Sequence, residues 1–98
     1  MVNLNKIIGF EWDRWNSDKS YKKHGITQNE AEQVFLDPKQ LILDDVKHSQ
    51  DERRFTIIAQ INNKAILFIT FTVRKDKIRI ISARKANTKE RRLYEKKT

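Results

Sequence analysis

Three arginines are placed where they could bind a phosphate group, because Arg74, Arg79 and Arg84 lie at or near the ends of predicted β-strands. An arginine guanidinium stays charged, and its planar fork matches the spacing of phosphate oxygens. Cleavage of RNA without a metal needs a base for the 2′-hydroxyl, a cation for the phosphate and a proton donor for the leaving 5′-oxygen. Arginine suits the second of these tasks. The alternative, for each arginine taken singly, is an ordinary exposed side chain at a strand edge.

Two further side chains could move a proton. His24 follows a basic turn and precedes Gly25, and the pKa of an unperturbed histidine lies near neutrality. Tyr94 lies in the last predicted helix, where its ring could stack on a base or its hydroxyl could donate a proton. Structural roles explain both as well, His24 by contact with a helix dipole and Tyr94 by packing on the sheet. The candidate catalytic residues are therefore Arg74, Arg84, Tyr94 and His24.

The composition favours a polyanionic partner. Twenty-one Lys and Arg residues stand against 13 Asp and Glu, giving a net charge of +8 and a sequence pI near 9.9. Nucleic acid is the commonest polyanion, although such a charge can also serve only to keep a small protein in solution. Glu52 could act as a base or simply form an ion pair. The candidate RNA-binding residues are Lys23, Arg53, Arg79, Lys89 and Arg91.

Other classes of site are disfavoured by residue types that the chain lacks. It has no cysteine, and its two histidines, His24 and His48, stand far apart, so no familiar set of metal ligands is visible. The only glycines are Gly9 and Gly25, which excludes a glycine-rich phosphate loop. No apolar run is long enough for a signal peptide or membrane span. We expect one cytoplasmic domain over residues 1–98, with no metal, no cofactor and no membrane association.

The N-terminal third predicts a strand followed by two helices. Residues 7–12 are apolar and aromatic, as in a short strand. A helix is predicted from Asp13 to about Lys23, and Gly25 is a natural stop. Residues 27–30, Thr-Gln-Asn-Glu, have the pattern of a capping box, so a second helix is predicted from there to Asp37 and Pro38.

The remainder predicts consecutive strands and a final helix. Short or alternating apolar runs occupy residues 41–43, 55–61, 65–74 and 78–84, separated by polar turns. Asn87 and Glu90 then mark the start of a helix. The fold class that we predict is α+β, a small antiparallel β-meander packed with two N-terminal helices and one C-terminal helix.

The turn at residues 75–76 decides which side chains share a face of the sheet. A two-residue turn places Arg74 opposite Lys77 and Thr72 opposite Arg79, and turns the apolar side chains of both strands toward the helices. A three-residue turn would instead put Arg74 on the face that carries Arg84. We predict the two-residue turn.

The order and spacing of several motifs resemble the BrnT toxin family over almost the whole chain. They are Phe-Glu-Trp-Asp at 10–13, Lys-His-Gly-Ile at 23–26, Asp-Pro at 37–38, and the block from Ile78 to Arg84 followed by Glu90 and Tyr94. The resemblance implies a RelE-like fold and a ribonuclease toxin of a type II toxin–antitoxin module, which inhibits translation by cutting RNA. It also implies a BrnA-type protein antitoxin, through which the complex binds operator DNA. Whether the free chain forms a dimer is left open.

The resemblance also transfers site residues. Arg74 matches the arginine of a threonine-x-arginine element that begins at Thr72, Arg84 matches the arginine that ends the last strand, and Tyr94 matches the tyrosine of the last helix. His24 matches the histidine of the lysine-histidine-glycine element. Family members often have Asn where this chain has Ser20, and the hairpin at 75–76 is short. A basic module that binds nucleic acid or an antitoxin without turnover is the alternative function.

Overall fold

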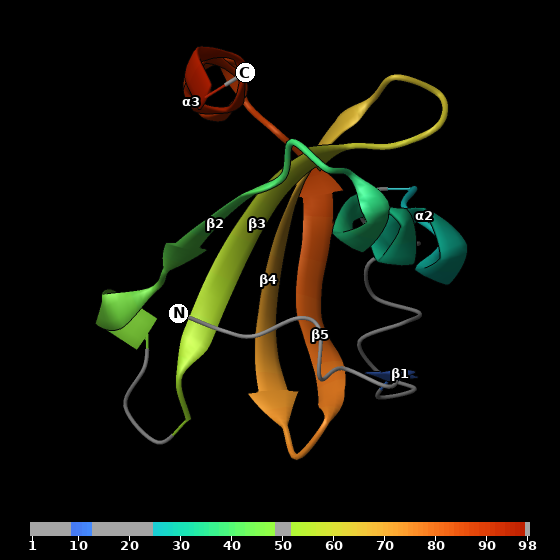
Figure 1. Ribbon diagram of the computed structural model, residues 1–98, viewed down its shortest axis with the longest axis vertical. Coiled ribbons are helices and arrows are strands. Elements are labelled where there is room, and N and C mark those ends of the chain that lie inside the picture. Colours follow the sequence, from blue (N-terminus) through green and yellow to red (C-terminus); the bar gives the residue numbers. More distant parts are fainter. Residues whose placement is uncertain (1–8, 13–24, 49–51, 98) are drawn as a thin grey trace.

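The fold is a five-stranded mixed β-sheet with one short helix against one face and a second helix at one end (Figure 1). The structure is a computed structural model that describes residues 9–12, 25–48 and 52–97. Along the chain, the elements are β1 (Gly9–Glu11), α2 (Gln28–Gln33), the 3₁₀ turn η2 (Val34–Leu36), β2 (Leu41–Asp44), the 3₁₀ turn η3 (Val46–His48), β3 (Arg54–Gln60), β4 (Ile66–Arg74), β5 (Lys77–Lys85) and α3 (Thr88–Lys97).

The predicted meander is confirmed, but the prediction of a purely antiparallel sheet is wrong. Strands β2, β3, β4 and β5 follow one another as antiparallel neighbours. β1 adds to the outer edge of β5 in parallel, with Phe10 beside Ile78. Hairpin reasoning relates strands that are joined by short turns. A hairpin pattern does not indicate the direction of a strand such as β1, which comes from the other end of the chain.

Within the described residues there are two α-helices, whereas the sequence predicted three. The first predicted helix, residues 13–23, falls outside the described part of the chain. The capping box at Thr27 is confirmed, because the Glu30 amide donates to Oγ1 of Thr27 and Glu30 accepts from the Thr27 amide. α2 is one turn and a half long and tightens into η2 before Asp37. The cap at the start of α3 is confirmed in the same way, between Asn87 and Glu90.

The core lies between the sheet and the segment α2–η2. Its cluster of apolar side chains takes alternating positions of β3, at Phe55, Ile57 and Ala59, and of β4, at Leu67, Ile69 and Phe71. Two ring contacts join Phe35 of η2 to the sheet, edge-on with Phe71 at 5.1 Å between centroids and tilted against Phe10 of β1 at 5.4 Å. Within the sheet, Phe55 stacks on Phe71 at 5.5 Å. Each such pair adds about 1 kcal/mol beyond burial. The core-facing residues of the hairpin are Leu67, Ile69, Phe71, Val73, Ile78 and Ile80.

The register of the β4–β5 hairpin agrees with the prediction near the turn and departs from it further along the strands. Arg74 lies opposite Lys77 and Thr72 opposite Arg79, which confirms the two-residue turn, and Lys75 adopts the positive φ of +58° that primed turns use. Further along, the register shifts between Thr70 and Phe71, so that Phe68 lies opposite Arg84. The shift inserts one extra residue into β5 and reverses which face the following side chains occupy. Arg84 therefore lies on the face of Arg74, which the sequence predicted only for a three-residue turn.

Candidate functional site

The face of the sheet away from α2 carries three of the candidate residues, Arg74, Arg79 and Arg84. We call it the second face; it presents Arg54, Thr56 and Ile58 of β3, Phe68, Thr70, Thr72 and Arg74 of β4, and Arg79, Ser82 and Arg84 of β5. Two hollows lie on it, and both are lined by Arg54 and Ile81, so they adjoin. We call the smaller one, about 200 Å³, the arginine hollow. The larger one, about 670 Å³, is the leucine hollow.

The arginine hollow gathers three guanidinium groups around a single carboxylate. Its lining residues are Glu52, Arg54, Thr72, Arg74, Arg79 and Ile81. Arg74 donates two hydrogen bonds to Glu52, from Nε to Oε2 at 2.6 Å and from Nη2 to Oε1 at 3.1 Å. Hydrogen bonding to Arg74 and the neighbouring positive charges hold the pKa of Glu52 below its usual value, and the Glu52 contact raises the pKa of Arg74. Both groups are therefore ionised at neutral pH.

Arg54 is the functional candidate that sequence reasoning missed. It begins β3, lies opposite Thr72, and Thr72 in turn lies opposite Arg79, so that one row across three strands presents two arginines. Pairing between β3 and β4 was not predicted from the sequence. With that pairing, the position of Thr72 opposite Arg79 would also have indicated Arg54 as its neighbour on β3. The Thr72 hydroxyl donates to the Arg53 carbonyl oxygen at 2.7 Å and is almost fully buried. It therefore holds the start of β3 in place beneath Arg54.

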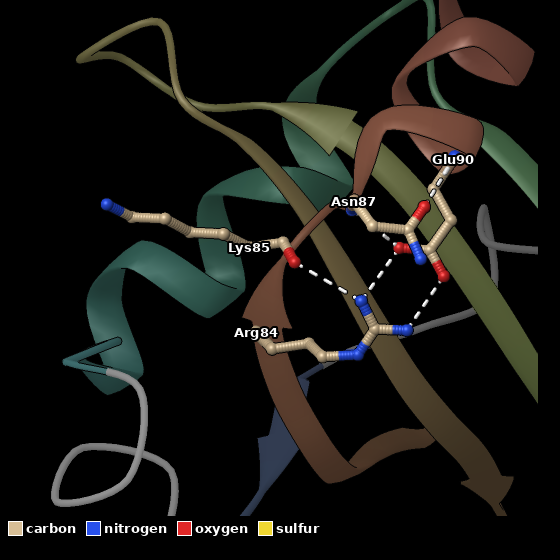
Figure 2. A network of polar contacts seen from close by, with 4 residues as sticks. All are labelled: Arg84, Lys85, Asn87 and Glu90. Carbon is tan, nitrogen blue, oxygen red and sulfur yellow. Dashed lines mark hydrogen bonds and ion pairs between the residues drawn. The ribbon is translucent and has the colours of Figure 1, made fainter.

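Arg84 lies at the opposite end of the second face. Its cross-strand partner Phe68 precedes Arg74 by six residues, which is about 20 Å along β4 at ~3.3 Å per residue. Figure 2 shows its guanidinium turned toward the start of α3, where Nη1 and Nη2 each donate to a Glu90 oxygen at 2.7 Å. Nη1 also donates to the Lys85 carbonyl, and the guanidinium lies 4.2 Å from the centroid of the Phe68 ring. Arg74 and Arg84 thus lie on the same face of the sheet but are too far apart to bind the same phosphate group.

The contacts of Arg84 fasten the last helix to the sheet. Glu90 accepts from Arg84 and from the Asn87 amide at once, while its own amide donates to the Asn87 side chain at 2.8 Å (Figure 2). Burial raises the pKa of Glu90, but these hydrogen bonds outweigh it and leave the pKa below its usual value. Lys85 points away from this group (Figure 2). The contacts with Glu90, the Lys85 carbonyl and the Phe68 ring account for the position of Arg84. Its predicted role in catalysis stays a prediction.

Tyr94 is buried, with 5% of its surface exposed, and its hydroxyl donates to Asp37 Oδ2 at 2.6 Å. Burial and the Asp37 hydrogen bond raise the pKa of Tyr94 to about 12. Asp37 also accepts from the backbone amides of Gln60 and Lys39, each at 2.9 Å. This network joins α3, β3 and the turn after η2. Tyr94 lines neither hollow, so its geometry fits the packing alternative, and a role on RNA remains untested.

The other predicted residues are divided among several places. Arg79 lines the arginine hollow and Lys89 the leucine hollow. Arg53 ion-pairs with Asp44 at 2.9 Å and stands over the Phe55 ring, while Arg91 is exposed on α3 and lines neither hollow. The remaining two, Lys23 and His24, lie outside the described residues.

The leucine hollow has a different character. Leu43, Phe68 and Leu93 supply apolar surface next to the fully buried Ile58, and Leu43 and Leu93 are 39% and 43% exposed. Three carboxylates, those of Asp44, Asp45 and Glu90, stand beside it, against the two cations Arg54 and Lys89. Among the described residues, no three histidine or acidic side chains are grouped to hold a metal ion. No described helix is long and apolar enough to cross a membrane.

Comparison with known proteins gives one family and one fold. A family model described as "Ribonuclease toxin, BrnT, of type II toxin-antitoxin system" matches residues 12–90. The chain is similar to the 1.1 Å crystal structure of the Brucella abortus ribonuclease toxin BrnT, with a TM-score of 0.63 and 18% sequence identity over 83% of this chain and 99% of that one. At that identity the likeness shows the fold alone. No curated protein sequence matches.

Proposed function

We propose that this chain, which belongs to the BrnT family of ribonuclease toxins of type II toxin–antitoxin systems, is a metal-independent endoribonuclease whose substrate phosphate binds in the arginine hollow. Membership of such a system implies an RNA target and a protein antitoxin. The finer parts of the proposal are that RNA cleavage inhibits translation, that the antitoxin is of the BrnA type, and that the fold is RelE-like. The observation that carries the proposal is the convergence of Arg54, Arg74 and Arg79 around Glu52.

Three guanidinium groups suit the charge that develops on a phosphate under attack. Arg54, Arg74 and Arg79 start from three adjacent rigid strands, so their positions are set before substrate arrives. Arg74 is about half exposed and its partner Glu52 is similarly accessible, so from solvent a phosphate oxygen can reach Arg74 and a 2′-hydroxyl can reach Glu52. A guanidinium has five donors, and the two that bind Glu52 leave others for the phosphate. Arg84, at the other end of the face, is assigned no part in binding this phosphate.

Glu52 is the group in the hollow that can accept a proton. In the proposed step, the 2′-hydroxyl loses its proton to Glu52 while its oxygen bonds to the adjacent phosphorus. The bond from phosphorus to the 5′-oxygen breaks, and that oxygen takes a proton from a donor, for which His24 and water are the candidates. The lowered pKa of Glu52 makes it a weak base, so proximity to the 2′-hydroxyl must offset its low basicity.

A binding module without turnover is the second candidate, and one observation favours it. None of the described residues that line the arginine hollow carries a proton that is readily given up at neutral pH, because the cations among them are all arginines. Such a hollow could hold RNA without cutting it. The two candidates differ only in whether the RNA backbone is broken.

The test is an assay of purified protein on end-labelled RNA, with and without a metal chelator. The proposal predicts cleavage that persists in chelator and that falls by at least ~100-fold in Arg74→Ala, as is typical when one transition-state donor is removed. Lys77→Ala is the matched control, since Lys77 lies opposite Arg74 on the hairpin, carries the same charge and lines neither hollow.

The possible results separate the candidates. Bound but intact RNA would establish the binding module instead. Cleavage abolished by chelator would contradict metal independence. Equal loss in Arg74→Ala and Lys77→Ala would show that net charge, and not the arginine hollow, governs the reaction.

A further inference from the structure

The leucine hollow is unlike the rest of this basic chain, and its chemistry does not match a polyanion. The whole chain has 21 basic and 13 acidic residues, whereas the lining of the leucine hollow has three carboxylates and two cations. Two of those carboxylates are already ion-paired, Asp44 with Arg53 and Glu90 with Arg84. A phosphate at this rim would meet three carboxylates beside two cations, whereas the arginine hollow has one carboxylate beside three arginines. RNA is therefore better accommodated at the arginine end.

The same hollow has the surface of a protein-binding site. Leu43 of β2 and Leu93 of α3 are partly exposed in its lining, and Phe68 together with the fully buried Ile58 completes its apolar part. A volume of about 670 Å³ is within the range of sites that bury apolar groups. Among the strands of the described residues, β2 is also the last in the order β1-β5-β4-β3-β2, and an outer edge of this kind can receive a further strand. An apolar segment flanked by lysine or arginine fits both this apolar part and the acidic rim.

We propose that the leucine hollow is the docking site of the antitoxin, and that it takes an antitoxin segment with apolar side chains flanked by cationic ones. The inference rests on the proposed function, because it requires that this chain be a toxin restrained by a protein partner. It departs from the simple expectation that the partner of a chain with a charge of +8 docks through acidic residues alone.

The shared wall between the hollows would explain neutralisation. Arg54 and Ile81 line both of them. A segment seated in the leucine hollow would therefore contact the same arginine that we assign to the RNA phosphate. Docking at one hollow would then hinder RNA in the other without entering it.

The test uses the full chain with its cognate antitoxin, the purified product of the adjacent gene. In the double variant Leu43→Glu/Leu93→Glu, antitoxin affinity by calorimetry should fall by at least ~100-fold, since docking would bury two new carboxylates against apolar side chains of the partner. RNA cleavage by the free variant should stay within ~3-fold of the parent. Leu36→Glu is the matched control, because Leu36 is 82% exposed and lines neither hollow, and it should bind the antitoxin like the parent.

Three results would overturn the inference. The first is antitoxin affinity of the double variant within ~3-fold of the parent. The second is loss of RNA cleavage with antitoxin affinity retained, which would make the leucine hollow a base-binding part of the RNA site. The third is equal weakening by the Leu36→Glu control. A dimer of the free parent that the double variant dissociates, with antitoxin affinity unchanged, would assign the leucine hollow to a second copy of this chain.

Hydrogen exchange on the parent complex decides the case in which the double variant unfolds or loses both activities. Antitoxin should protect the amides of β2 and of α3 near Leu93, and protection confined to other elements would contradict the inference. The result is separable from the nuclease proposal. A parent chain that leaves RNA intact but shows this protection would disprove the nuclease while the docking site stands.

Discussion

The two hollows of the second face are built from the same three strands but have opposite chemistry. At the arginine hollow, three guanidinium groups surround one carboxylate. At the leucine hollow, three carboxylates and two cations accompany apolar side chains. The difference arises from what lies beyond the three shared strands: Glu52 precedes β3 at one end, while β2 and α3 bring Leu43, Asp44, Glu90 and Leu93 to the other. Charge averaged over a chain therefore says little about where a polyanion binds.

The contrast between the two hollows is tested most directly at Arg54, which lines both of them. We expect Arg54→Ala to lower RNA cleavage by ~100-fold or more, because it removes a cation aimed at the transition-state charge. Arg54→Lys should recover part of the rate, since the charge returns without the planar fork. The measurement is single-turnover cleavage of labelled RNA. A rate equal to that of the parent would remove Arg54 from the site.

A second test contrasts Arg84 with Arg74. Arg84→Ala should lower the free energy of unfolding by about 1–2 kcal/mol, since it removes a two-pronged contact to Glu90 that is partly exposed. Its cleavage rate, corrected for the folded fraction, should fall by less than ~10-fold. Urea unfolding and the RNA assay measure the two effects. A loss of activity as deep as that of Arg74→Ala, in a chain of parental stability, would return Arg84 to the catalytic centre.

Tyr94→Phe should act on stability and leave chemistry unchanged. The substitution removes the hydroxyl that donates to Asp37 but leaves Asp37 with the amides of Gln60 and Lys39. We expect a loss of about 1–2 kcal/mol in the free energy of unfolding. Cleavage by the folded variant should be within ~3-fold of the parent rate. A collapse of activity with stability intact would instead support the predicted role of Tyr94 on RNA.

The smallest expected effects are those of pH, and their signs follow from the folded-state pKa values. Burial alone would raise the pKa of Asp37, but its hydrogen bonds from Tyr94, Gln60 and Lys39 prevail, so the pKa is lowered from 3.8. The stability it confers is therefore complete above its unfolded pKa and is lost as pH falls below about 4. Tyr94 has the opposite sign. Its pKa rises from 10.0 to about 12, so its contribution is complete below pH 10 and lost between pH 10 and 12.

Ultraviolet titration checks the alkaline limb directly. The chain has two tyrosines, and one of them should ionise near pH 12 in the parent. That transition should be absent in Tyr94→Phe. On the acid side, urea unfolding between pH 7 and pH 3 should show a weaker pH dependence in Asp37→Asn than in the parent. An unchanged acid limb would show that Asp37 does not carry it.

Much of the local structure was predictable because it depends on residues close together in the chain. The capping pairs Thr27–Glu30 and Asn87–Glu90 form as expected, since each joins positions three apart. The two-residue turn at Lys75 set the register of the hairpin from Thr72 to Arg79. The alternation in the central strands correctly indicated which side chains form the core.

The site was less predictable, for identifiable reasons. The register shift beside Ile81 moved Arg84 to the face of Arg74, and nothing in the alternation of apolar residues marks an inserted residue of β5 that is itself apolar. Arg54 went unnoticed because its importance depends on pairing between β3 and β4. The first of the three predicted helices, residues 13–23, and the neighbouring His24 lie outside the described residues. Both therefore stay predictions.

By itself, the sequence determined the strand periods, the starts of α2 and α3, the turn at Lys75 and the family, because each depends on short-range spacing that any chain with these residues would share. Only the tertiary structure decided which partner each charged group takes. Glu52 meets Arg74 across 22 positions and Asp37 meets Tyr94 across 57. Such pairs form when distant elements pack, since the free energy that selects among several possible carboxylates comes from burial of the sheet and helices around them.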